Sequence, residues 1–121
     1  MALRRLRLAA ALLLALVAAA PLAAQDFVEG VEDLPLMAGL AQVPEAGVSF
    51  DAPEGRIVVA YAQGAISTES VLAFYAKTLP QLGWQRLGER SFQREKERLS
   101  LDLTREQGLL TVRFTLAPRK P

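Results

Sequence analysis

The chain has 121 residues, with 14 lysines and arginines against 13 aspartates and glutamates, and it contains no histidine and no cysteine. The absence of these two residue types excludes disulfides and the usual zinc, haem and copper ligand sets, and it removes the commonest general base. We therefore expect no cofactor and no metal, and the sequence offers no catalytic motif that would indicate an enzyme.

The first 24 residues have the layout of a secretory signal peptide. A short basic stretch, residues 1–7, precedes an apolar run over residues 8–20, and a proline and small residues follow. We predict cleavage between Ala24 and Gln25, and export to the periplasm or beyond by the general secretion route. An uncleaved membrane anchor is the alternative, but the apolar run is at the lower limit for crossing a bilayer. No membrane span is expected after cleavage.

The 97 residues that follow the leader are enough for one domain with its own core. Because the leader contains three arginines, the remainder has 11 basic residues against 13 acidic ones. This slightly acidic balance gives no basic surface for nucleic acid, which we therefore do not expect as a partner.

Residues 25–47 form an irregular segment, since glycines and prolines interrupt any long helix. Its first part is nevertheless rich in apolar residues: Phe27, Val28, Val31, Leu34, Leu36, Met37 and Leu40. Such a composition is too apolar for a solvated linker, so we expect the segment to pack on the domain. The alternative is that Leu34, Leu36 and Met37 dock a partner protein.

Residues 48–51 and 56–63 are predicted to be two strands of a hairpin. A loop of four residues gives the register Asp51 with Arg56, Phe50 with Ile57 and Val48 with Val59. This register predicts one apolar face, and it brings opposite charges together on the other face.

Residues 67–82 are predicted to be the long helix. Ser67 or Thr68 can cap its start, and Gly83 is placed to end it in the left-handed conformation. Pro80 should kink the last turn or make it a 3₁₀ turn. The spacing predicts one buried face, made of Val71, Phe74, Tyr75, Thr78, Leu79 and Leu82.

Four strands are predicted in the remainder: residues 84–87, 91–95, 98–104 and 109–116, with a frayed tail at 118–121. A loop over residues 105–108 sets Leu103 against Leu110, Leu101 against Val112 and Leu99 against Phe114. The alternating residues Ser100, Asp102, Thr111, Arg113 and Thr115 then form a polar face.

The predicted element order is β-β-α-β-β-β-β over residues 48–117. Strands that alternate in polarity need a cover on their apolar face, and the single helix supplies it. The sequence therefore predicts a two-layer α+β domain, an antiparallel sheet with one covering helix.

Several stretches together resemble small exported bacterial proteins of unknown function. They are residues 33–37, Phe50-Asp51, residues 55–58, Phe74-Tyr75 and Leu79-Pro-Gln-Leu-Gly-Trp84. In such proteins a helix ending in Phe-Tyr…Leu-Pro-x-Leu-Gly-Trp precedes a β-meander. The resemblance implies export and an α+β fold, and it carries no catalytic residue to this chain.

The first functional hypothesis is a small non-enzymatic accessory or binding protein of the periplasm, with an envelope protein as its partner. A flat apolar patch near Met37 would favour this hypothesis. The alternative is a carrier of a small apolar ligand between helix and sheet. A pocket lined by Tyr61, Tyr75 and Trp84 would favour the carrier.

Overall fold

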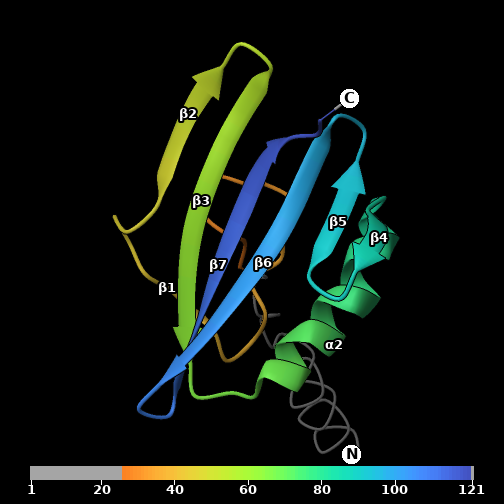
Figure 1. The fold of residues 1–121 in the computed structure, drawn as a ribbon. Helices are drawn as coiled ribbons and strands as arrows, with labels where there is room; N and C mark the ends of the chain where they lie inside the picture. The colour runs from red at the N-terminus through yellow and green to blue at the C-terminus, as the bar shows by residue number, and fades with distance from the viewer. Residues whose placement is uncertain (1–25, 121) are drawn as a thin grey trace, which may run out of the picture.

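A computed structural model describes residues 26–120 as an α+β domain, a seven-stranded antiparallel sheet with one 15-residue helix (Figure 1). The strands are β1 (Ala41–Gln42), β2 (Val48–Ala52), β3 (Gly55–Gly64), β4 (Gln85–Gly88), β5 (Ser91–Arg94), β6 (Glu97–Glu106) and β7 (Leu109–Pro118). The helix comprises α2 (Thr68–Thr78) and the 3₁₀ turn η1 (Leu79–Leu82). The α+β class and the element order predicted from the sequence are confirmed, with β1 as an additional strand.

The sheet has the order β1-β3-β7-β6-β5-β4, and β2 also pairs with β3. Strands β1 and β2 share one edge of β3: β1 pairs with residues 62–63 and β2 with residues 55–59. Strand β2 therefore forms one margin of the sheet, and β4 forms the opposite margin (Figure 1).

The predicted register of the β2–β3 hairpin is confirmed, from Asp51 opposite Arg56 to Val48 opposite Val59. The predicted charge pair is not formed, because Arg56 binds Glu97 of β6, with 3.0 Å between Nε and Oε2. The apolar pairs also lie on the face of the sheet that the helix does not cover. The buried residues of β3 are instead those that point to the helix-covered face: Val58, Ala60 and Ala62.

The helix begins and ends as the sequence predicts. The Ser67 side chain accepts a hydrogen bond from the Ser70 amide, and Gly83 has a φ of 92° after the 3₁₀ turn that contains Pro80. Val71, Tyr75 and Leu79 are buried, whereas Phe74 and Leu82 are partly buried at the margin of the core.

The predicted register of β6 and β7 is wrong by two residues. Leu103 lies opposite Val112, and Leu101 lies opposite Phe114. The loop has two residues rather than four, because Gln107 and Gly108 both adopt positive φ, 51° and 77°, as a type I′ turn requires. A shift of two residues leaves every side chain on its predicted face.

The helix and residues 26–40 cover the same face of the sheet. In Figure 1 this segment (orange) passes behind the sheet, and α2 lies beside it. The segment folds back on itself, since the Val28 amide donates to the Leu34 carbonyl and the Leu36 amide donates to the Asp26 carbonyl. Its buried residues are Val28, Val31, Leu34, Pro35, Leu36 and Leu40. The core is thus shared by sheet, helix and segment.

Within the described residues, no helix has the length and apolar character needed to cross a membrane.

Candidate functional site

The face of the sheet away from the helix, the open face, carries apolar side chains at one margin. Val48 is 55% exposed and Phe50 is 51% exposed, and their partners Ile57 and Val59 are partly buried beside them. We call these four residues the β2–β3 strip. Large apolar side chains that stand together on a surface mark a contact site in soluble proteins.

Most of the rest of the open face is polar, although Leu109 at the start of β7 is 40% exposed there. Arg113 of β7 binds Asp102 of β6, with 3.0 Å between Nη2 and Oδ2, and Asp102 raises the pKa of this guanidinium by accepting its hydrogen bonds. Farther from the strip along β3, the Gln63 amide donates to the Thr111 hydroxyl of β7, at 3.0 Å. The predicted polar face is confirmed, and it borders the β2–β3 strip.

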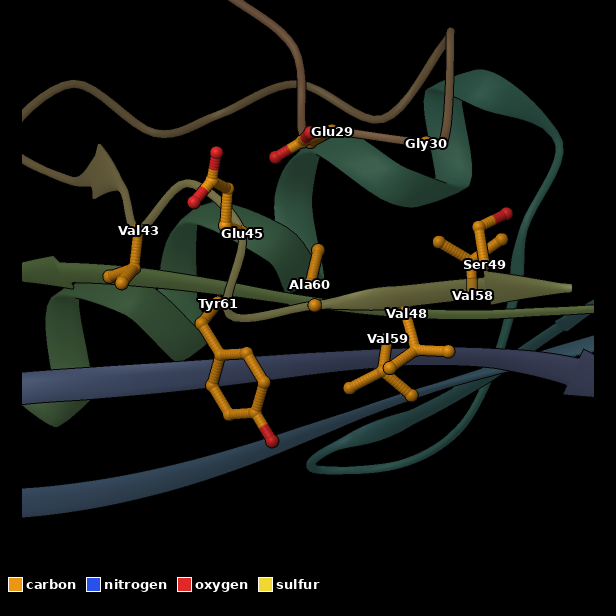
Figure 2. Close-up of a pocket in the computed structure, with 11 residues that line it drawn as sticks. Glu29, Gly30, Val43, Glu45, Val48, Ser49, Val58, Val59, Ala60 and Tyr61 are labelled. Carbon is orange, nitrogen blue, oxygen red and sulfur yellow. The ribbon is translucent and has the colours of Figure 1, made fainter.

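A shallow cavity of about 100 Å³ lies at the edge of β3, where the chain passes from β1 to β2 (Figure 2). Tyr61, Val59 and Val48 point toward the open face, whereas Glu29 and Glu45 lie on the other side of β3. The cavity is smaller than the 300–1,000 Å³ typical of sites for small organic ligands. It can accept a side chain of a bound protein, next to two carboxylates.

The three residues predicted to line a ligand pocket do not come together. Tyr75 is 0% exposed and Trp84 is buried, both on the helix side of the sheet, whereas Tyr61 lies on the open face. The Tyr75 hydroxyl donates to the Pro35 carbonyl at 2.8 Å, and burial raises its pKa. Trp84 packs under the Arg94 guanidinium, which lies 4.4 Å from the ring centroid. Both aromatic residues are therefore part of the packed core.

The residues predicted to dock a partner are also part of this core. Leu34 is 1% exposed and Leu36 is buried, while Met37 is partly buried against the same cluster. They cover the sheet area that the narrow helix leaves free, so they present no apolar patch near Met37. The predicted cleavage residues Ala24 and Gln25 lie outside the described residues.

The exposure of the β2–β3 strip was not predicted from the sequence. Strand β3 has apolar residues on both of its faces, so periodicity alone does not decide which face is buried. A usable signal is the small size of Ala60, Ala62 and Gly64 on the other face. Small side chains allow another backbone to approach closely, and a Cβ on Gly64 would lie 2.1 Å from the Gly39 carbonyl oxygen.

Among residues 26–120, no three acidic side chains come close enough to hold a metal ion. Comparisons of the chain with protein-family models, with curated proteins and with solved structures found no match.

Proposed function

We propose that this protein is a small exported, non-enzymatic accessory protein that binds an envelope protein through the β2–β3 strip. The main support is the exposure of Val48 and Phe50 on a paired strand. A strand that is held by its neighbour presents these side chains in a fixed arrangement. Less conformational entropy is then lost on binding.

The surroundings of the strip also suit a protein interface. Stable interfaces combine an apolar centre with a polar rim that carries hydrogen-bonding groups. Here Phe50 and Val48 supply the centre, and Gln63, Thr111 and Arg113 lie further along the same face. The cavity beside Tyr61 adds a recess for one side chain of the partner.

The carrier alternative receives no support from the packing of the described residues. Tyr75, Phe92 and Phe114 fill the layer between helix and sheet, each with at most 1% of its surface exposed. The cavity beside Tyr61 lies at the sheet edge instead, so it is not a pocket under the helix.

Site-specific photo-cross-linking in the native bacterium tests the proposal. A photoreactive residue replaces Phe50 in one strain and Lys77, which is exposed on the helix, in another. We expect an adduct with one envelope protein from position 50 only. Excess wild-type protein should suppress this adduct, whereas excess Phe50→Ser protein should not. Adducts that are equal at both positions, or none at position 50, would contradict the proposed function.

A further inference from the structure

We propose that two copies of this chain pair along the free edge of β2, so that their sheets join into one continuous antiparallel sheet. In this dimer the two β2–β3 strips meet on the open face. The inference concerns self-association, so it does not depend on the identity of the envelope partner.

The orientation of the backbone groups of β2 follows from its neighbours. The Tyr61 carbonyl of β3 accepts a hydrogen bond from the Val43 amide, so residue 61 points its polar backbone groups to the β1–β2 edge. Residues 59 and 57 share this orientation, because the N–H and C=O groups of successive residues point to opposite sides of a strand, so every second residue points to the same side. Their partners Val48 and Phe50 therefore face β3. The intervening Ser49 and Asp51 point their amides and carbonyls outward, away from the sheet.

The two margins of the sheet differ in how they discourage further pairing. Strand β4 has a register shift between Arg86 and Gly88, and Arg86 adds a charge. Short, bulged or charged edges of this kind prevent association between sheets. Strand β2 pairs with β3 over five residues without a shift, and it contains no lysine, arginine or proline. The β2 edge thus lacks the register shift of the β4 edge, and its one charged residue is Asp51.

The sequence of β2 is complementary to a second copy of itself. In the antiparallel register centred on Phe50, Ser49 lies opposite Asp51 of the other copy, and the outward backbone groups of both residues find partners. Each Asp51 carboxylate then faces a serine hydroxyl. A register centred on Asp51 would instead place two carboxylates directly opposite each other, which is unfavourable. Charge therefore favours the Phe50 register over the Asp51 register.

This register places the two Phe50 side chains next to each other. The pair at the two-fold axis is a non-hydrogen-bonded pair, in which Cα atoms are about 4.5 Å apart and side chains are in close contact. Pairs of aromatic residues at such positions stabilise antiparallel sheets. Both rings lie on the open face, so the dimer presents one larger apolar surface there, with the polar parts of both sheets on either side.

The first test is sedimentation equilibrium, with protein that has been purified in the form that the exporting cell produces. We expect the mass to rise from monomer to dimer with concentration. Ser49→Lys should lower the dissociation constant about five-fold, because symmetry places each new lysine opposite an Asp51 carboxylate. Ser49→Glu should raise it by a similar factor, and Gln85→Glu on the β4 margin should not change it. Circular dichroism confirms that each variant is folded.

Disulfide formation tests the register directly, since the natural chain has no cysteine. The Cα separation of about 4.5 Å at the two-fold axis is within the range that a disulfide accepts. Mild oxidation should therefore link Phe50→Cys protein into a covalent dimer, and it should leave Asp51→Cys protein unlinked, because Asp51 faces Ser49.

Two results would overturn this inference. One is a wild-type protein that stays monomeric up to about 1 mM. The other is a dimer that is indifferent to charge at position 49 and forms disulfides equally from positions 50 and 51. Either result would leave the proposed envelope partner untouched, because the cross-linking experiment measures adducts with a different protein.

Discussion

The hydroxyl of Tyr75 donates a hydrogen bond of 2.8 Å to the carbonyl oxygen of Pro35, which is 40 residues earlier in the chain. The Tyr75 hydroxyl oxygen also accepts a hydrogen bond from the Met37 amide, at 3.4 Å. Tyr75 lies in α2 and Pro35 in the irregular segment, so one side chain joins the two elements that cover the sheet. The segment is held by specific polar contacts in addition to its buried leucines.

The Tyr75→Phe variant should be less stable than the wild type by about 1–3 kcal/mol, because the Pro35 carbonyl would be left buried without its partner. Urea denaturation measures this loss. Tyr61→Phe on the open face is the matched control, and we expect a clearly smaller change. Equal losses in the two variants would mean that the hydroxyl of Tyr75 does not hold the segment.

The stability of the wild type should fall in alkaline solution. Burial raises the pKa of Tyr75 in the folded protein above its unfolded value of about 10. A raised pKa contributes stability that is complete below the unfolded pKa, and it is lost as pH rises further. Relative to Tyr75→Phe, the wild type should lose about 1.4 kcal/mol for each pH unit above 10. A constant difference between the two proteins from pH 8 to about pH 11.5 would contradict this.

Arg94 should contribute more to stability than Arg113, which binds Asp102 between the neighbouring strands β7 and β6. It binds Asp33, donates to the Leu82 carbonyl at 3.0 Å and stacks over Trp84. We expect Arg94→Met to cost about 1–2 kcal/mol in thermal or urea denaturation. Arg113→Met removes an exposed pair, whose side chains are 49% and 56% exposed, and it should change the stability far less than Arg94→Met does. If Arg113→Met were the more destabilising variant, the contacts of Arg94 would not be what holds the segment on the domain.

Gly64→Ala should test how closely the segment approaches β3. A Cβ at this position would lie 2.1 Å from the backbone oxygen of Gly39, which cannot move without displacing the segment. We expect a loss of about 1–3 kcal/mol, as for other overpacked sites. The control is Gly88→Ala, where a Cβ meets nothing within 4 Å. Similar urea midpoints for both variants would show that the segment does not lie against β3 here.

Local sequence signals predicted most of the fold. The Ser67 cap, the 3₁₀ turn at Pro80 and the left-handed Gly83 each depend on neighbouring residues only, and each is confirmed. The register of β6 and β7 was mispredicted because Gln107 is an unusual residue for a positive φ. Turn type depends on the strands that the turn connects, so the dipeptide alone did not identify it.

The candidate site could not be predicted, because its position depends on tertiary packing. The register of β2 and β3 was correct, yet it does not say which face of the hairpin is buried. That choice is made by the segment around Leu34, which shares one buried cluster with Ala60 and Ala62 and leaves Phe50 on the surface. A contact between parts of the chain that are distant in sequence leaves no periodic signal.

Thiol labelling of two valine variants tests most directly whether the β2–β3 strip is a free surface. The chain has no cysteine, so Val48→Cys and Val112→Cys each introduce one thiol on a strand, at positions that are 55% and 0% exposed. With a maleimide in dilute, reducing-agent-free buffer, position 48 should react within about ten-fold of its rate in the unfolded protein, whereas position 112 should react only as the protein opens globally. Protection of both positions to the same degree would place the strip in the core and contradict its role as a contact surface.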